Sequence, residues 1–322
     1  MNQQNKKNLR NRIYLALWAV CTAILAPAQD LLPPRMKVEQ RACTLPEYTS
    51  RGNIPVRPVS VGSAMPDTFR DTLPNHLTRG EKLYPFFERL MRNDVPVRVV
   101  HLGDSHVRGH VFTIETRHRL EQAWGAEAVM PDSVTYRTSA LAVETGRPGL
   151  VYHTMGINGA TTSHFMPTEK LDAIAALHPD LIILSFGTNE SHGRRYDESD
   201  HLLQLDSILH QLRTRCPQAE VMLTTPPGSY IRQRRRGPRV INTLTPRVVE
   251  TLQHFAAERG LPLWDMYNIV GGKKRACLNW TNGKYMQRDR IHYTHGGYLL
   301  QGDLLAEAIL KSFNDYVADR LE

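Results

Sequence analysis

The sequence predicts an α/β protein whose mostly parallel sheet is covered by helices on both faces. Short runs rich in β-branched residues alternate with longer segments in which apolar side chains recur every three to four positions. Polar and glycine-rich segments follow several of these runs, as expected where parallel strands end. The 322 residues can bury one large core, and 22% charged residues are typical of a globular chain.

The first residues have the pattern of an export signal. Four basic residues precede an apolar run from Ile13 to Leu25, and Ala26-Pro27-Ala28 supplies small residues for cleavage. The alternative is an uncleaved membrane anchor, for which this run is short. We therefore expect residues 1–28 to be a signal peptide and the mature chain to lie in the periplasm or outside the cell, without a transmembrane segment. Removing these four positive and no negative side chains lowers the net charge from +8 to +4.

The remaining chain divides into an arm and a domain. Residues 29–77 are rich in proline and polar residues and show no sustained periodicity, which predicts an irregular N-terminal arm. Residues 78–322 are expected to form one domain. The mature chain keeps three cysteines, Cys43, Cys216 and Cys277, so at least one is unpaired within the chain. We interpret all three as structural.

The domain is expected to contain five strands, each a short apolar run. They are residues 97–102, 150–155, 181–186, 221–225 and 261–264. Helices are expected between them. They begin at Glu81, after Ser105, near Leu202, at Thr245-Pro246 and before Leu300.

Ser105 lies where the first predicted strand meets a helix. At this position a side chain points into the crevice of the sheet, and the N–H groups of the helix can stabilise an anion. Serine is also a common helix N-cap, so its position alone does not predict catalysis. A serine hydroxyl becomes a good nucleophile only when a base removes its proton.

Asp289 and His292 can supply that base, because they lie three residues apart on one predicted loop before the last helix. An imidazole accepts the serine proton, and a carboxylate fixes its tautomer and stabilises its cation. Acyl transfer also needs donors for the developing oxyanion. Residues 156–162, with Gly159, follow the second strand, and residues 187–190, with the side-chain amide of Asn189, follow the third.

Together these segments resemble the SGNH (GDSL-like) hydrolase family. The matching blocks are Gly103-Asp104-Ser105, Gly159, Gly187-x-Asn189 and Asp289-x-x-His292, in the family's order. The resemblance implies a three-layer flavodoxin-like fold with a central, mostly parallel five-stranded sheet, and it makes residues 78–322 the catalytic domain. It also implies that Ser105 is the nucleophile, His292 the base and Asp289 its partner. The backbone N–H groups of Ser105 and Gly159 and the amide of Asn189 would form the oxyanion hole, and no cofactor or metal is needed. The Gly-x-Ser-x-Gly elbow of ordinary α/β-hydrolases is absent at Ser105.

Finer details are similar to the bacterial peptidoglycan O-acetylesterase branch. They are His101-x-Gly-Asp-Ser-His106, Gly-x-Asn-Gly-Ala160, Gly-Thr-Asn-Glu190 and Asp289-x-x-His-x-Thr294-x-x-Gly297-Tyr298. The expected substrate is therefore an acetylated carbohydrate polymer, with 6-O-acetylated N-acetylmuramic acid in peptidoglycan as the leading candidate. Relatives can carry a carbohydrate-binding insert between blocks one and two, but the spacing from Ser105 to Gly159 leaves no room for one. Another acetylated glycan or a lipid ester stays open as substrate, and the oligomeric state is not predicted.

Several other features have two interpretations. Asp104-x-His106 is compatible with a metallohydrolase, although no further well-spaced ligands accompany it, and a non-catalytic wall-binding protein would keep the same fold. Trp280 and Tyr285 are candidates for a sugar-facing wall, or are buried aromatic residues. His101, His106 and His110 are expected to pack in or near the site.

The arginine-rich segment 232–239 is either a surface for an anionic polymer or a solvated loop. It has no interleaved aromatic residues, so we expect no nucleic-acid binding.

Overall fold

The computed structural model describes residues 48–49, 55–56, 58–130, 139–193, 195–233 and 237–321. Contacts divide the chain into two units, Met1–Lys37 and Val38–Glu322, and every described residue belongs to the second. The expected signal peptide and Cys43 lie outside the described residues, so those predictions stay predictions.

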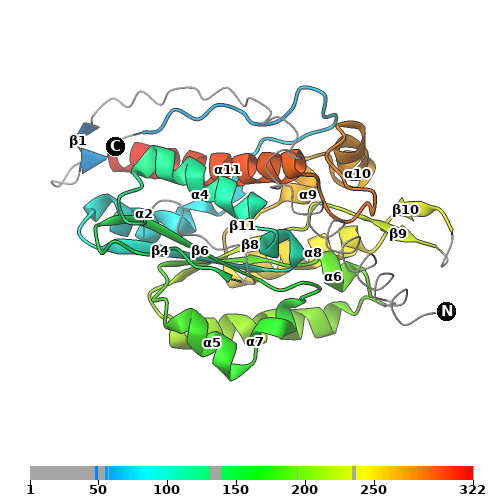
Figure 1. The fold of residues 1–322 in the computed structure, drawn as a ribbon, viewed down its shortest axis with the longest axis horizontal. Coiled ribbons are helices and arrows are strands. Elements are labelled where there is room, and N and C mark those ends of the chain that lie inside the picture. The colour runs from blue at the N-terminus through cyan, green and yellow to red at the C-terminus, as the bar shows by residue number, and fades with distance from the viewer. Residues whose placement is uncertain are drawn as a thin grey trace, which may run out of the picture. The chain divides into compact units, whose positions relative to one another are not determined.

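Seven of the described strands form one sheet, in the order β3-β11-β8-β7-β4-β6-β5 (Figure 1). The five inner strands are parallel, and β3 and β5 pair antiparallel at the edges. The bounds are β3 (Leu77–Thr78), β4 (Pro96–Gly103), β5 (Ser139–Ala140), β6 (Gly149–Gly156), β7 (Leu181–Ser185), β8 (Glu220–Thr224) and β11 (Leu263–Trp264). In chain order the inner strands follow the flavodoxin-like arrangement 2-1-3-4-5. The predicted α/β class is confirmed, with two short edge strands beyond the predicted five.

Two short antiparallel pairs stand apart from this sheet. They are β1 (Tyr48–Thr49) with β2 (Pro55–Val56), and β9 (Tyr230–Arg232) with β10 (Arg239–Ile241). The second pair is a hairpin.

The described helices include all those that were expected, and several short ones. They are α2 (Tyr84–Arg92), α3 (Ser105–Arg108), α4 (Val111–Trp124), α5 (Thr168–Ala175), α6 (Thr188–Ser191), α7 (Glu198–Arg215), α8 (Thr245–Arg259), α9 (Met266–Ile269), α10 (Gly272–Asn282) and α11 (His295–Leu321), with 3₁₀ turns η1 (Gly80–Leu83) and η2 (Thr162–Phe165). The helical stretch expected after Ser105 is interrupted at His110, whose φ of 64° is left-handed. The break separates α3 from α4.

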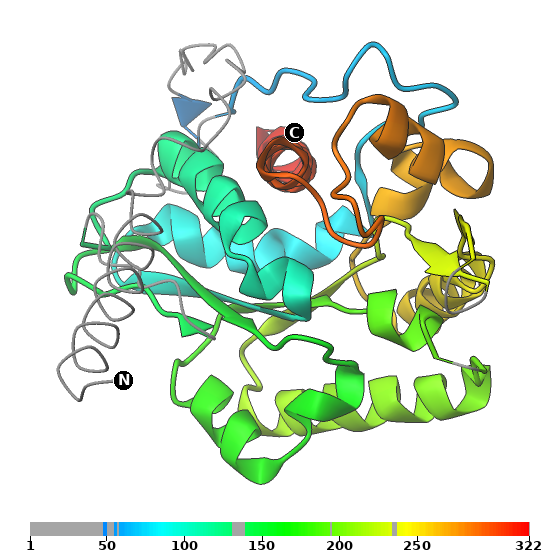
Figure 2. The same cartoon turned by 45° about the vertical axis from the view of Figure 1, so that its right-hand side comes forward.

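The sheet has an apolar core on each face because side chains alternate along its strands. Val97 and Val99 of β4 belong to a core that includes residues of α2, α4 and α11, whereas Val100 and Leu102 join a core with α5, α7 and α8. Figure 2 shows α11 nearly end-on above the sheet, with α4 on the same side. The described unit therefore has three layers of helix, sheet and helix.

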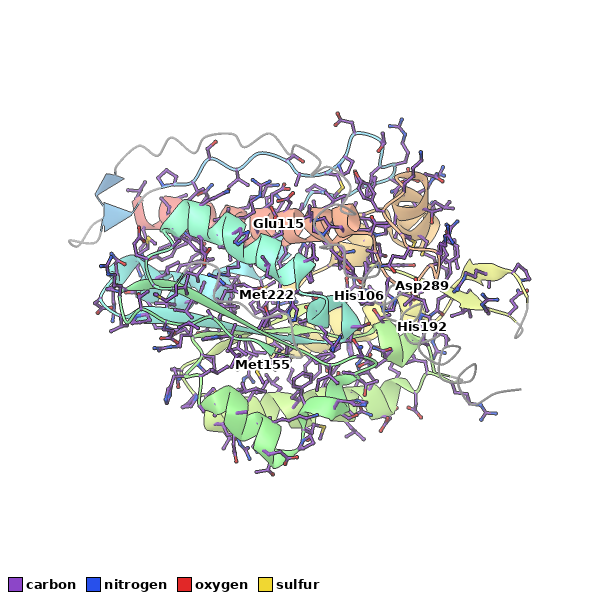
Figure 3. The ribbon with its side chains drawn as sticks, in the orientation of Figure 1. His106, Glu115, Met155, His192, Met222 and Asp289 are labelled. Carbon is purple, nitrogen blue, oxygen red and sulfur yellow. The ribbon has the colours of Figure 1, made fainter. Side chains whose placement is uncertain are left out.

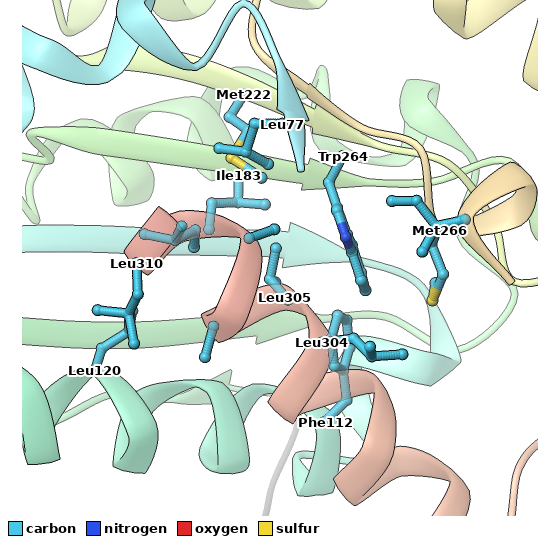
Figure 4. Close-up of a cluster of buried hydrophobic side chains, with 14 of the residues drawn as sticks. Leu77, Phe112, Leu120, Ile183, Met222, Trp264, Met266, Leu304, Leu305 and Leu310 are labelled. Carbon is cyan, nitrogen blue, oxygen red and sulfur yellow. The ribbon is translucent and has the colours of Figure 1, made fainter. Parts of the chain in front are cut away.

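The C-terminal helix α11 is the centre of the first core. Leu304 and Leu305 are fully buried and lie with Phe112 and Trp264 between the helix and the sheet (Figure 4). Burying a leucine side chain stabilises the fold by about 1.5–3 kcal/mol. This helix also fixes the loop that precedes it, which carries Asp289 and His292.

Residues 58–76, part of the expected arm, contain no helix or strand and are fastened to the domain by side-chain hydrogen bonds. Val59 and the amide of Asn314 exchange two bonds of 2.7 Å. Asn75 donates to the carbonyl of Leu304 and accepts from the indole N–H of Trp264. These contacts place the segment along α11, and residues 29–47 lie outside the described residues. Within the described ranges no helix is both long enough and apolar enough to cross a membrane.

Candidate active site

Three of the predicted segments meet at the carboxyl edge of the sheet. In register, Gly103 at the end of β4 lies opposite Gly156 on one side and Ser185 on the other. The chain order reverses between β4 and β7, and such a reversal creates a crevice beyond the strand ends. The segments that carry Ser105, Gly159 and Asn189 begin at this crevice.

Ser105 is the first residue of α3 and is half-buried. Asp104 caps the helix, since its Oδ1 accepts the N–H of His106 at 2.9 Å. The helix lies so close to β6 that a Cβ on Gly156 would be 2.2 Å from the backbone nitrogen of Arg108. Because only glycine fits at that position, Gly156 allows α3 to present Ser105 at the strand ends.

Ser105, His292 and Asp289 form one continuous chain of hydrogen bonds. The Oγ of Ser105 is 3.0 Å from Nε2 of His292, and Nδ1 of His292 is 2.6 Å from Oδ2 of Asp289. A carboxylate only accepts, so Nδ1 carries the hydrogen and Nε2 is the acceptor for the serine hydroxyl. Burial acts to raise the pKa of Asp289, but hydrogen bonds from His292 and from two backbone N–H groups outweigh it and lower the pKa to about 2.

The loop that carries Asp289 and His292 is shaped by its own hydrogen bonds. Oδ1 of Asp289 accepts the backbone N–H groups of Ile291 and His292, both at 2.9 Å. Arg290, between Asp289 and Ile291, has a φ of 58°, a left-handed conformation that is uncommon for a residue with a side chain. The carbonyl of Arg290 accepts the N–H of Tyr230 in β9 at 2.9 Å. The hairpin therefore holds this loop from outside.

Asn189 and Gly159 come from neighbouring loops and are brought to the same edge. Nδ2 of Asn189 donates to the carbonyl of Ala160 at 2.9 Å, and it lies 3.3 Å from Oδ2 of Asp104. Gly159 is exposed, with a φ of 72°. Burial raises the pKa of Asp104 to about 7, although its hydrogen bond from His106 opposes the shift. One amide thus links the loops after β4, β6 and β7.

Glu190 connects two of these loops, a contact that the sequence prediction missed. Its Oε1 accepts the N–H of Thr162 at 2.9 Å, and its Oε2 accepts the N–H of Gly187 at 2.9 Å. The side chain is only 6% exposed. A glutamate three residues after a helix N-cap commonly accepts the N-cap N–H, so the spacing from Gly187 predicts half of this arrangement. The reach to Thr162 depends on the fold.

His101, His106 and His110, which were expected to pack in or near the site, are all buried. His101 is fully buried, with Nδ1 2.7 Å from the hydroxyl of Tyr152 and Nε2 2.6 Å from Oγ of Ser185, and burial lowers its pKa to about 3. His106 lies with its ring 5.5 Å from that of His292, and burial lowers its pKa to about 3 as well. Figure 3 shows His106, His192 and Asp289 near the end of the sheet where β9 and β10 project.

Of the two interpretations of Trp280 and Tyr285, the structure supports buried aromatic residues and not a sugar-facing wall. Trp280 is fully buried, and its indole N–H donates to the carbonyl of Pro227 at 3.1 Å. Tyr285 is 8% exposed and packs edge-on against Trp280 and Phe69. Phe69 belongs to the segment that precedes α2, and it covers both rings. These aromatic residues support the loop before α11 from within.

The metal-ligand interpretation of Asp104 and His106 finds no support among the described residues. No group of three His, Cys, Asp or Glu side chains there is arranged to hold a metal ion. Asp104 caps α3, and Nδ1 of His106 lies 3.0 Å from the hydroxyl of Tyr298.

The described cysteines, Cys216 and Cys277, are buried and free, and burial raises the pKa of Cys277 to about 12.

Comparison with solved structures gives several matches. A peptidoglycan O-acetylesterase superposes with a TM-score of 0.61 at 18% identity, covering 74% of this chain and 99% of the other. An acetylxylan esterase from Geobacillus stearothermophilus has a TM-score of 0.44 at 17% identity, covering 67% and 94%. A GDSL-like lipase from Bacteroides thetaiotaomicron has a TM-score of 0.45 at 20% identity, covering 71% and 98%. The first of these likenesses shows a shared fold.

Comparison with curated protein sequences gives no match. The model of the GDSL-like lipase/acylhydrolase family matches residues 102–300, which include Ser105, Gly159, Asn189, Asp289 and His292. The matched region is more than half of the chain and extends from the end of β4 into α11. The chain therefore belongs to the GDSL-like lipase/acylhydrolase family of ester hydrolases.

Proposed function

We propose that the protein is an exported serine esterase that removes O-acetyl groups from a cell-envelope carbohydrate, with peptidoglycan as the leading substrate. The observation that carries this proposal is the hydrogen-bonded chain from Ser105 through His292 to Asp289 at the sheet edge. Such a chain gives a serine a base for its proton and gives that base an orienting carboxylate.

The proposed reaction has two steps. Ser105 attacks the acetyl carbonyl while Nε2 of His292 takes its proton, and His292 then protonates the departing sugar oxygen. A water, activated by the same nitrogen, later releases acetate from the acyl-enzyme. The ionised Asp289 stabilises the imidazolium form of His292 in both steps.

The oxyanion is assigned to three donors, the backbone N–H groups of Ser105 and Gly159 and the side-chain amide of Asn189. The bond from this amide to Asp104 is long, at 3.3 Å, whereas its bond to Ala160 is 2.9 Å. The hydrogen directed at Asp104 is therefore the one that we expect to turn towards a substrate oxygen. Losing one such donor typically lowers kcat by about 10²–10³-fold.

Glu190 is assigned as a positioning residue for these donors. By accepting from Thr162 and Gly187, it fixes the loop of Gly159 against the loop of Asn189. In Glu190→Gln an NH₂ group replaces one carboxylate oxygen and faces a backbone N–H, either that of Thr162 or that of Gly187, so the loops separate. We expect kcat to fall by about tenfold to hundredfold with little change in KM, and stability to fall by about 1–3 kcal/mol.

Steady-state kinetics and thermal unfolding of Glu190→Gln test this role. Glu198→Gln, which removes an exposed carboxylate at the start of α7, is the matched control. A lowered Tm with unchanged kcat in Glu190→Gln would confine Glu190 to stability and would contradict a role in positioning.

The carbohydrate assignment is supported by the sequence blocks and by the shared fold with a peptidoglycan O-acetylesterase. The described part of the chain between Ser105 and Gly159 contains α3, α4, β5 and β6, which belong to the domain itself. We therefore expect a polymer to bind on the surface of the catalytic domain. Export is supported by the signal-like pattern in residues 1–28.

Release of acetate from O-acetylated peptidoglycan tests the substrate assignment. The comparison substrates are acetylated xylan and 4-nitrophenyl esters of acetate and longer acids, each assayed with Ser105→Ala as blank. We expect the highest kcat/KM on peptidoglycan among the polymers and a preference for acetate among the small esters. Faster release from xylan would assign another acetylated glycan, and a preference for long acyl chains would point to a lipid ester.

A further inference from the structure

We infer that the hairpin β9–β10 is a substrate-binding arm of the active site, and that Arg232 and Arg239 bind a carboxylate of an anionic glycan. This inference rests on the proposed deacetylase function for the kind of polymer that reaches the site. Neither arginine belongs to the proposed catalytic chain.

The base of the hairpin is joined to the catalytic edge on both sides. The N–H of Tyr230 donates to the carbonyl of Arg290, between Asp289 and His292. Ser229, just before β9, bonds through Oγ to Nε2 of His192 at 2.8 Å, and His192 directly follows α6. A polymer bound beside Ser105 therefore has the hairpin as its neighbour.

The two arginines lie directly opposite each other on the hairpin. Arg232 pairs in register with Arg239, so their side chains are on the same face of the two strands. Like charges at such positions repel and destabilise the pair. A carboxylate between them would remove the repulsion, because each guanidinium can donate two parallel hydrogen bonds to it.

The face that carries these arginines is the one that meets the catalytic loop. Tyr230 and Arg232 are two positions apart in β9, so their side chains share a face about 7 Å apart. The guanidinium of Arg290 stacks on the ring of Tyr230, with 5.6 Å from its Cζ to the ring centroid. Arg290, Arg232 and Arg239 thus form a row of positive charge that leads outward from the catalytic loop.

This charge is not balanced by carboxylates of the described residues. The described ion pairs of arginine involve other side chains, and none includes Arg232, Arg239 or Arg290. Between Tyr230 and Ile241 the sequence contains no acidic residue. Arg290 also donates to Oγ1 of Thr281 at 2.9 Å, which holds its side chain in place. An acidic polymer is the partner that this row fits by charge.

The test uses polygalacturonate as a carboxylated glycan and dextran as a neutral one. Each is measured as an inhibitor of 4-nitrophenyl acetate hydrolysis, and its binding is also measured by calorimetric titration, which needs no turnover. The test variant is Arg232→Gln with Arg239→Gln. The control is Arg147→Gln with Arg213→Gln. It removes two exposed arginines near the amino ends of the strands, away from the catalytic end: one just before β6 and one at the end of α7.

We expect polygalacturonate, but not dextran, to bind the wild type and inhibit it competitively at low salt, with weaker binding at high salt. Loss of both hairpin arginines should raise the inhibition and dissociation constants by about tenfold, with less than about twofold change in the control. Equal binding by the test and control variants, or no binding of polygalacturonate to the wild type, would overturn the inference. Binding of double-stranded DNA in place of polygalacturonate would also overturn it. Failure of the wild type to release acetate from peptidoglycan would instead contradict the proposed substrate. The calorimetric titration would still decide whether the hairpin arginines bind a carboxylated glycan.

Discussion

Ser105→Ala is expected to lower kcat for 4-nitrophenyl acetate by about 10⁶-fold, the loss typical when the nucleophile of a hydrogen-bonded triad is removed. The Oγ of Ser105 has His292 as its described partner, so its loss leaves no buried polar group without a bond. Alanine keeps the backbone N–H at the start of α3, and Asp104 still caps the helix. The fold and substrate binding should therefore persist while turnover stops.

Steady-state kinetics, thermal unfolding and covalent labelling together check this result. Ser207→Ala, which removes a hydroxyl from the middle of α7, is the matched control and should keep the wild-type kcat. Phenylmethylsulfonyl fluoride should add its mass to the wild-type peptide that contains Ser105, and to no peptide of Ser105→Ala. If Ser105→Ala retained more than about a tenth of kcat in a pure preparation, the assignment of the nucleophile would be wrong.

The features that could be predicted from the sequence are those set by local patterns. The five inner strands are short apolar runs, and each was expected within two residues of its observed bounds. Ser105 follows from its residue type and its position at a strand end, and the pair Asp289/His292 from its spacing on the loop before the last helix. Their convergence requires the reversal of strand order between β4 and β7, which the resemblance to a known family supplied.

The features that were missed depend on contacts between distant segments. The burial of Trp280 was one of two interpretations left open, and its packing partner Phe69, more than two hundred positions earlier, could not be identified from the sequence. The edge strands β3 and β5 are two residues long and exist only through pairing with β11 and β6. Glu190 reaches Thr162 across two loops that are adjacent only in the folded chain. Local propensity carries no information about such pairs.

Asp289→Asn is expected to lower kcat by about 10⁴-fold while it leaves the loop intact. The side-chain oxygen of asparagine still accepts the N–H groups of Ile291 and His292, which now go to Oδ1 of Asp289. The amide nitrogen, however, faces Nδ1 of His292 as a donor. The hydrogen of His292 then moves to Nε2, which can no longer accept the proton of Ser105.

The stability of the protein should depend on pH through Asp289. The pKa of Asp289 is lowered to about 2, so this carboxylate stays ionised throughout mild acid. Because the pKa in the folded state is below the ordinary value of about 4, the ionised group stabilises the fold above that pH, and this contribution disappears as the pH falls towards 2. Chemical unfolding should accordingly show a stability difference between the wild type and Asp289→Asn that narrows from pH 5 to pH 2, roughly the interval over which a carboxylate with this shift takes up its proton.

Asp315→Asn, an exposed substitution on α11, should instead keep the kcat and the pH dependence of the wild type. A value of kcat for Asp289→Asn within about tenfold of the wild type would show that His292 keeps its working tautomer without this carboxylate. In that case the hydrogen bonds within the loop, rather than the charge of Asp289, would orient the base. The geometry favours orientation of the base by the Asp289 carboxylate. The hydrogen bond described at Nδ1 of His292 is the 2.6 Å contact with Oδ2 of Asp289.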